Sequence, residues 1–352
     1  MGWWFVCFVF EEEIIMIIVR TPLRVTFAGG GSDIPSYFYQ HDGSCINATI
    51  DKYVYVLVKK RSDNKVYLKY SENEVVDVEN ITNIKHDFIR ETLLYLGINY
   101  GIEIINWADI PTKGSGLGSS GSFLVGLLHA IHTLQGDDVS KEILAKEASY
   151  IEMIKCFKPI GYQDQYAASY GGVNQFYFST TQDYQHVVKV KSFNLSDKYL
   201  RLISDNLLLF YTGITRESKD ILEDQNKEMT ENINVVELMK KNVSLSHELS
   251  NAIKNDRFDF IGDALNTNWE LKSQFSDKIL NEKIKLMYYD GLKAGAQGGK
   301  LLGAGGGGYM MFYVEKNFHN RVVEKMSEYQ MMPISIDKYG SRILLNTEDK
   351  VW

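Results

Sequence analysis

A segment rich in glycine and serine, residues 111–123, has the composition of a loop that binds phosphate. Four glycines and four serines stand within residues 114–122. The segment follows an apolar stretch at 101–107 that reads as a strand, and it leads into an apolar helical pattern at 123–134. Glycine lets the backbone approach a ligand closely, and free amides at the start of a helix attract anions. We therefore expect backbone amides and hydroxyls here to hold phosphate groups. The alternative is a flexible turn that caps a core helix.

The same segment contains a weaker motif, because residues 116–121 fit the G-x-G-x-x-G pattern of dinucleotide-binding folds and residues 303–308 repeat it. Such a fold places an acidic residue about twenty positions on, at the end of a second strand. Asp137 and Asp138 stand near that distance, but they follow a predicted helix. The lysine that follows the last glycine of a Walker loop is also missing. A dinucleotide-dependent oxidoreductase is therefore a distant alternative.

Dense glycine occurs in three segments, at 22–33, 111–123 and 300–310, which lie far apart in the sequence. Loops carry glycine where the backbone approaches a ligand or another backbone. The three segments together predict one shared site, whereas three unrelated tight turns are the alternative.

In their order and content, the three segments resemble the three motifs of the GHMP kinases, which phosphorylate galactose, homoserine, mevalonate and phosphomevalonate. The resemblance extends over nearly the whole chain from Met16. Gly121 departs from the pattern, since the family often has alanine there, and we expect this change to be sterically mild. Within the family, residues 21–38 and 161–172 most resemble the D-glycero-D-manno-heptose 7-phosphate kinases, and fucokinase domains share much of the pattern.

The resemblance implies an ATP- and Mg²⁺-dependent kinase that phosphorylates the anomeric hydroxyl of a sugar phosphate. Heptose 7-phosphate is the expected substrate, with a fucokinase or another sugar-1-kinase as the alternative. A non-enzymatic protein that binds ATP on the same fold is a further alternative. The residues expected to bind the nucleotide are Lys113, Gly114, Ser115, Gly116, Leu117, Gly118, Ser119, Ser120 and Gly121.

Carboxylates and hydroxyls are expected to supply the metal site, because Mg²⁺ prefers hard oxygen ligands. Ser120 and Glu152 are the expected pair; Ser119 is the alternative hydroxyl and Glu147 the competing acid. Asp164, twelve residues beyond Glu152, matches the family's catalytic acid and would orient the sugar hydroxyl.

Further residues are expected around the acceptor. Arg24 matches the family arginine beside the reacting hydroxyl, where its fixed charge would hold Asp164 ionised or neutralise the transferring group. Asp33 would accept hydrogen bonds from sugar hydroxyls. The remaining substrate-binding predictions are Gly30, Gly31, Gly305, Gly306 and Arg216, with Lys113 and Lys155 as alternatives to Arg216 for the acceptor's own phosphate.

The elements that must position these residues form a mixed α+β pattern. Strands are expected near 16–33, 46–60, 65–70, 101–107, 173–179 and 206–213, on both sides of the glycine turn at 303–308, and at 333–337 and 341–345. Helices are expected at 87–96, 123–134, 140–157, 217–254, 258–274, 278–294 and 317–329. The resemblance implies a two-domain architecture, with an N-terminal α/β, ATP-binding domain over 16–195 and a ferredoxin-like C-terminal domain over 196–352.

Composition excludes several classes of protein. The chain has 352 residues and a net charge of −7, which argues against a nucleic-acid partner. Residues 1–15 begin with an apolar run that is too short to span a bilayer and lacks signal-peptide features, so we expect an appendage and no membrane partner. An aromatic anchor that touches a membrane surface is the alternative. Three scattered cysteines suggest neither disulfides nor a metal site. We expect a cytoplasmic location, and the oligomeric state, a dimer included, stays open.

Overall fold

A long antiparallel strand pair forms the centre of the larger sheet. The computed structural model describes residues 15–111, 114–181, 186–215, 218–276 and 278–348. Strand β1 (Met16–Ala28) pairs with β2 (Gly43–Lys60) over nearly its whole length. Because residues 43–60 are long enough to serve two neighbours, β2 pairs with β6 (Val173–Thr180) at one end and with β5 (Ile102–Ala108) at the other.

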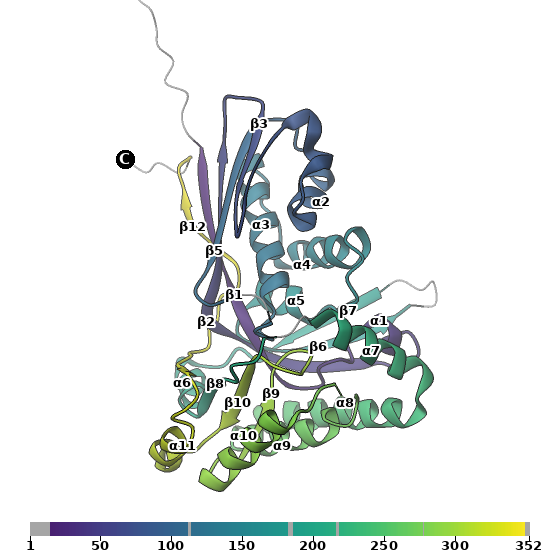
Figure 1. Ribbon diagram of the computed structural model, residues 1–352, viewed down its shortest axis with the longest axis vertical. Helices are drawn as coiled ribbons and strands as arrows, with labels where there is room; N and C mark the ends of the chain where they lie inside the picture. The colour runs from purple at the N-terminus through teal and green to yellow at the C-terminus, as the bar shows by residue number, and fades with distance from the viewer. Residues whose placement is uncertain (1–14, 112–113, 182–185, 216–217, 277, 349–352) are drawn as a thin grey trace, which may run out of the picture.

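The eight-stranded sheet is completed by strands that are distant in sequence. Its main path runs β12-β1-β2-β5-β3-β4, and β7 extends the branch formed by β6. The added strands are β3 (Lys65–Lys69), β4 (Asn73–Asp77), β7 (His186–Ser192) and β12 (Arg342–Asn346). Strand β12 brings the last described part of the chain back to the edge of β1 (Figure 1).

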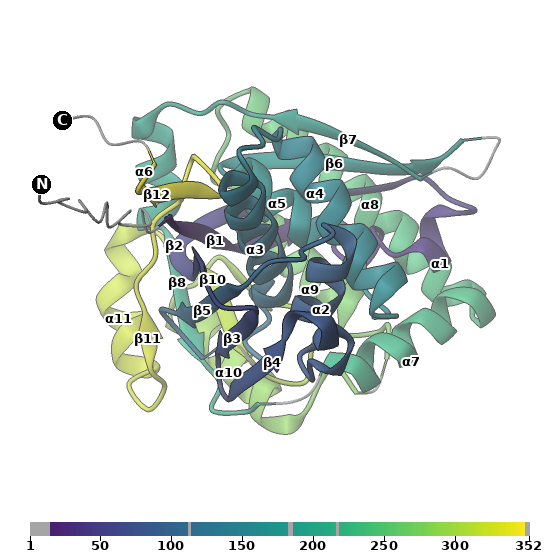
Figure 2. The same ribbon diagram turned by 90° about the horizontal axis from the view of Figure 1, so that it is seen from above.

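One face of this sheet is covered by helices that follow the glycine-rich segment. Helix α3 (Ser119–Gln135) packs on β1 and β2, and α4 (Lys141–Tyr150) and α5 (Gln163–Tyr170) pack beside it (Figure 2). Helix α2 (Asp87–Tyr95) lies next to α3. Most positions of α3 are buried, which explains why its sequence is apolar on all sides rather than on one stripe.

A second, four-stranded antiparallel sheet has the order β11-β8-β10-β9. Its strands are β8 (Leu207–Tyr211), β9 (Gly298–Leu301), β10 (Tyr309–Tyr313) and β11 (Met331–Met332). Helices α9 (Phe260–Lys272) and α10 (Glu282–Ala294) pack on β9, and α8 (Ile233–Lys254) bridges to β1 and β2. The smaller helices are α1 (Pro35–Phe38), α6 (Asp197–Asp205), α7 (Ser218–Glu231) and α11 (His319–Lys325).

The α+β class agrees with the sequence analysis, and three details differ. The helix expected over 217–254 is interrupted at Asn232, whose side chain accepts from the amide of Asn234 and caps α8. The strand expected at 333–337 is wrong, because only Ile336 makes an isolated bridge there and β11 lies earlier. Strands β4 and β7 and helix α6 were not expected. Within the described ranges, no helix has the length and apolar run needed to cross a bilayer.

Candidate active site

One cavity lies where the three glycine-rich segments meet. Its walls come from β1 and the turn after it, from residues 114–120, from residues 160–164, and from α9, β9 and the turn that follows β9. The segments are therefore not three unrelated turns, as the alternative interpretation had it.

Two of these segments touch through bare backbone. A methyl group placed on Gly303 would lie 2.4 Å from Cα of Gly116, and one placed on Gly116 would lie 2.7 Å from the carbonyl oxygen of Leu302. Gly303 and Gly116 also have φ values of +70° and +76°, in the left-handed region. Sterics and backbone conformation thus both require glycine at this contact.

The loop at 114–120 ends in a helix N-terminus that faces the cavity. Helix α3 begins at Ser119, directly after Gly118, which has a φ of +75°. The residues of this loop that line the cavity are Gly114, Ser115, Gly116, Gly118, Ser119 and Ser120. Leu117 is instead buried in the core, and Lys113 lies outside the described residues. This arrangement places backbone amides and hydroxyls at the cavity wall, and their binding of phosphate stays a prediction.

Gly121 packs against Asp164 rather than lining the cavity. A methyl group on Gly121 would lie 2.9 Å from Cβ of Asp164 and 3.2 Å from its carbonyl carbon. The expectation that alanine would be sterically mild here is wrong, because α3 approaches the backbone of α5 too closely for an added carbon.

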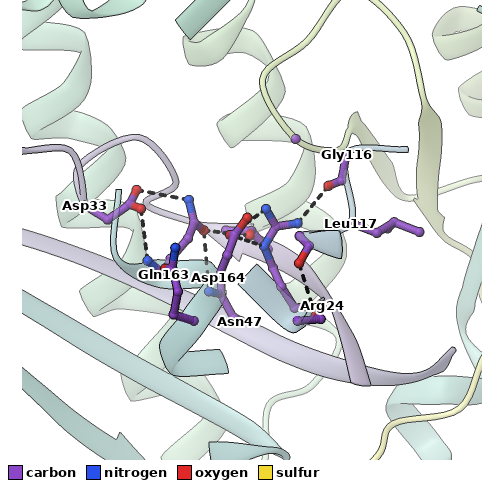
Figure 3. A network of polar contacts seen from close by, with 12 residues as sticks. Arg24, Asp33, Asn47, Gly116, Leu117, Gln163 and Asp164 are labelled. Atoms are coloured by element: carbon purple, nitrogen blue, oxygen red, sulfur yellow. Dashed lines mark hydrogen bonds and ion pairs between the residues drawn. The ribbon is translucent and has the colours of Figure 1, made fainter. Parts of the chain in front are cut away.

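Arg24 and Asp164 form an ion pair at the floor of the cavity (Figure 3). Nε and Nη2 of Arg24 both lie 2.7 Å from Oδ1 of Asp164, and Nη1 donates to the carbonyl oxygen of Gly116 at 2.7 Å. The backbone amide of Arg24 also donates to the carbonyl of Leu117, at 2.9 Å. The guanidinium of Arg24 therefore connects the loop at 114–120 to the candidate catalytic acid, Asp164.

Asp33 holds the start of the helix that carries Asp164. Its carboxylate accepts from the amide of Gly31 at 3.0 Å, from the amide of Gln163 at 3.1 Å and from Nε2 of Gln163 at 3.0 Å. Oε1 of Gln163 accepts from Thr26, which fixes the orientation of the amide (Figure 3). Burial, and then the nearby charge of Asp164, raises the pKa of Asp33 to about 6. Hydrogen bonds from N–H groups of Gly31 and Gln163 therefore hold this buried carboxylate in place.

Glu152 lies behind Ser120 on a π-helical turn, Ile151–Lys155, that extends α4. Its side chain is buried and accepts from Nε2 of Gln165 at 2.7 Å and from the hydroxyl of Ser120. Burial is the main cause that raises the pKa of Glu152 to about 7. The competing acid, Glu147, instead pairs with His132 at 2.7 Å, away from the cavity.

The Ser120–Glu152 pair fits a magnesium ion in its donor chemistry. A hydroxyl and a carboxylate are hard oxygen donors, and Mg²⁺ completes its shell with phosphate and water oxygens. A cation would also supply the charge partner that the buried carboxylate lacks. Among the described residues, no group of three or more His, Cys, Asp or Glu side chains could hold a metal ion.

The remaining predicted substrate residues divide into two groups. Gly30 and Gly31 line the cavity, whereas Gly305 and Gly306 turn toward Ile279 and do not. Lys155 is exposed, outside the cavity. Arg216 lies outside the described residues.

Two lysines that the sequence analysis did not select line the cavity. Lys272, at the end of α9, is 8% exposed, and Lys300, on β9, is 3% exposed. Burial, and then the charge of Arg24, lowers the pKa of Lys272 to about 7. Burial lowers the pKa of Lys300 well below its ordinary value, with Lys272 and Arg24 adding to the effect. In the sequence, only the position of Lys300 at the start of the third glycine-rich segment could have indicated its place in the cavity.

A family model and a curated relative agree with this geometry. The model described as the GHMP kinases N terminal domain matches residues 83–172, a range that holds Ser120, Glu152 and Asp164. A D-glycero-alpha-D-manno-heptose 7-phosphate kinase of Campylobacter jejuni is 29% identical over 332 residues, covering 89% of this chain and 94% of the relative. Over residues 83–172 the chain is similar to the GHMP kinases. The comparisons identify it as a kinase, a phosphotransferase with an alcohol group as acceptor.

Two further matches are to sugar kinases. The solved structure of a D-glycero-D-manno-heptose 1-phosphate kinase from Bacteroides thetaiotaomicron superposes with a TM-score of 0.77 at 21% identity, covering 94% of this chain and 99% of the other. That likeness shows the fold. A bifunctional fucokinase/GDP-fucose pyrophosphorylase of Arabidopsis thaliana is 23% identical over 313 residues, covering 83% of this chain but 29% of the relative.

The topology of the chain disfavours the dinucleotide alternative. That fold requires a parallel strand, helix, strand unit around its glycine loop. Here β5 leads through the first glycine loop to α3, which is followed by α4 rather than by a parallel strand. The second loop, 303–308, joins the antiparallel strands β9 and β10.

Proposed function

We propose that the chain is a GHMP kinase that phosphorylates the anomeric hydroxyl of D-glycero-D-manno-heptose 7-phosphate, giving the 1,7-bisphosphate. The observation that carries the proposal is the Arg24–Asp164 pair on the floor of a cavity whose other wall is the helix N-terminus at Ser119. The relative from Campylobacter jejuni, which matches across most of both chains, supports the choice of sugar.

In the proposed reaction, the sugar hydroxyl oxygen bonds to the terminal phosphorus of ATP while the bond from that phosphorus to ADP breaks. Asp164 accepts the hydroxyl proton through its second carboxylate oxygen, Oδ2, because Oδ1 is engaged by Arg24. Amides of residues 114–120 hold the phosphates. Arg24 keeps Asp164 in position and opposes the negative charge of the transferring group. Asp33 orients the start of α5 through Gln163 and accepts a hydrogen bond from the sugar.

We place the magnesium ion at Ser120 and Glu152. When bound there, it would neutralise phosphate charge. Glu152 would then be ionised, and its bond from Gln165 would hold the carboxylate in place.

We also propose a ferredoxin-like C-terminal domain. Its support is the element order β8, helices, β9, β10, α11, β11 together with the antiparallel sheet order β11-β8-β10-β9. The boundary near residue 195, the cytoplasmic location and the oligomeric state stay predictions.

The decisive experiment measures ATP consumption with a panel of acceptors: heptose 7-phosphate, unphosphorylated heptose, fucose, galactose and mevalonate. We expect the highest kcat/KM with heptose 7-phosphate, and product analysis should place the new phosphate on the anomeric oxygen. Preference for fucose would instead support the fucokinase alternative, for which the Arabidopsis thaliana match is the ground. Nucleotide binding without turnover of any acceptor would support the non-enzymatic alternative, and thermal stabilisation by NAD but not ATP would support the oxidoreductase.

A further inference from the structure

Lys272 and Lys300 bring two amino groups to the cavity that Asp33 and Asp164 also line. Lys272 ends α9 and Lys300 lies on β9, which packs against α9. Both side chains line the cavity while being 92% or more buried, since 8% and 3% of their surfaces are exposed. Lysine is almost never buried to this extent without a partner.

The protein satisfies these two groups only in part. Nζ of Lys272 donates to the carbonyl of Gly303 and, at 3.4 Å, to that of Leu301. An ammonium has three donors, so one remains. For Lys300, the described residues provide no hydrogen-bond acceptor and no ion-pair partner to Nζ, and no carboxylate among them pairs with Lys272 either.

The nearby acids are already occupied. Asp164 is held by Arg24, and Asp33 accepts from three N–H groups. Cys45, the other titratable group close to Lys300, is a buried thiol whose pKa is raised by burial. The cavity therefore presents three basic side chains, Arg24, Lys272 and Lys300, and only Arg24 has an ion-pair partner among the described residues.

We propose that Lys272 and Lys300 form a phosphoryl subsite that binds a dianionic phosphate of a substrate on the wall made by α9 and β9. The inference rests on the proposed kinase function and goes beyond it by assigning these two residues. The phosphate has two possible sources in the proposed reaction, the terminal group of the nucleotide and the acceptor's own phosphate. The contact of Lys272 with Gly303, which touches the loop at Gly116, places the subsite next to the nucleotide phosphates.

Protonation gives this subsite a measurable signature. In the ligand-free protein, burial lowers the pKa of Lys272 to about 7 and that of Lys300 well below its ordinary value. A dianion between them favours the charged forms, so ligand binding at pH 8 should be accompanied by proton uptake. A lysine that only supports the glycine turn would show no such uptake.

The test is titration calorimetry at pH 8 in two buffers of different ionisation enthalpy, with a nonhydrolysable ATP analogue, ADP, heptose 7-phosphate, unphosphorylated heptose and pyrophosphate. We compare wild type with Lys272→Met, Lys300→Met and Lys272→Gln, which keeps a donor to Gly303 without the charge. Lys293→Met, on the exposed side of α10, is the matched control. The melting temperature of each variant shows whether it folds. If Lys272→Met does not fold, Lys272→Gln replaces it in the comparison with wild type.

We expect proton uptake in the wild type and the control, reduced uptake in each lysine variant, and roughly 10- to 100-fold weaker binding of the phosphate-bearing ligand. Uptake with the ATP analogue but not ADP identifies the terminal phosphate. Uptake with heptose 7-phosphate but not heptose identifies the acceptor's phosphate. Wild-type protein that takes up no proton with any of these ligands, or variants that match wild type in both uptake and affinity, overturns the subsite. Since the nucleotide and pyrophosphate measurements need no turnover, a protein inactive on heptose 7-phosphate would refute the proposed substrate without deciding the subsite.

Discussion

Nε and Nη2 of Arg24 both lie 2.7 Å from the same carboxylate oxygen of Asp164, Oδ1, to which Nε donates a hydrogen bond (Figure 3). In a side-by-side arginine–carboxylate pair, each oxygen receives one hydrogen bond. The arrangement here leaves Oδ2 without a hydrogen bond from any described residue. The side chain of Asp164 is 23% exposed, against 6% for Arg24, so the carboxylate reaches the cavity while the guanidinium stays behind it.

Asp164→Asn should remove the proton acceptor while leaving the phosphate-binding loop intact. We expect kcat to fall by about 10²- to 10⁴-fold, the usual range for a general base, with the Kd of ATP within a few-fold of wild type. Steady-state kinetics and nucleotide titration measure the two effects, and Asp138→Asn, exposed beyond the end of α3, is the control. Equal turnover in the Asp164 variant and wild type would remove Asp164 from the mechanism.

Arg24→Lys keeps the charge but cannot contact Asp164 and the carbonyl of Gly116 together. The loop and the acid would lose their common support, so we expect kcat to fall by about 10²-fold, the loss that a misplacement of about 1 Å can cause. Arg20→Lys, on the same strand but outside this cavity, should retain activity. A fully active Arg24→Lys enzyme would show that the charge alone matters.

Gly121→Ala should displace α5 from α3, because the new carbon would lie 2.9 Å from Cβ of Asp164. We expect a loss of stability of about 1–3 kcal/mol from overpacking, and a lower kcat with ATP affinity largely kept. Denaturant unfolding and kinetics test both effects against Gln135→Ala at the exposed end of the same helix. Wild-type stability and turnover would mean that the two helices separate without effect on the site.

Glu152→Gln should weaken the use of magnesium, since an amide is a poorer ligand than a carboxylate. The expected result is a higher Mg²⁺ concentration for half-maximal activity, and a smaller stabilisation by Mg²⁺ with an ATP analogue. Glu147→Gln, on the preceding helix and paired with His132, serves as the control. If both variants showed the wild-type magnesium dependence, the metal would have to bind elsewhere.

The pKa of Glu152 also predicts how stability depends on pH in the metal-free protein. Its pKa is about 7 in the folded protein and 4.5 as its ordinary value. Between these values the folded protein holds a proton that the unfolded chain has released, so this residue lowers stability as pH rises from 4.5 to 7. In EDTA, the melting temperature of Glu152→Gln relative to wild type should therefore increase between pH 5 and pH 8. A constant difference would mean that Glu152 is ionised throughout.

Parts of the site could be predicted because local sequence carries them. The loop at 114–120 was visible as glycines and serines between a strand and a helix, and Asp164 and Glu152 came from the family resemblance. The packing around Gly121 was not visible, since the approach of α3 to α5 is set by the whole sheet beneath them.

The lysines of the cavity were missed for a similar reason. In the sequence, Lys272 looks like an ordinary basic residue in the last turn of a helix, where lysine is favoured by the helix dipole. Its burial follows only from the docking of α9 on β9 and β1. The pairing of β12 with β1, across more than three hundred residues, was equally invisible to local patterns.

The backbone contact between Gly116 and Gly303 couples the stability of the two sheets. The first residue follows a strand of the eight-stranded sheet, and the second follows a strand of the four-stranded sheet. A nucleotide bound beside this contact would stabilise the two sheets only while they remain packed together. Saturating ATP should consequently merge any separate melting steps of the two sheets into a single cooperative transition.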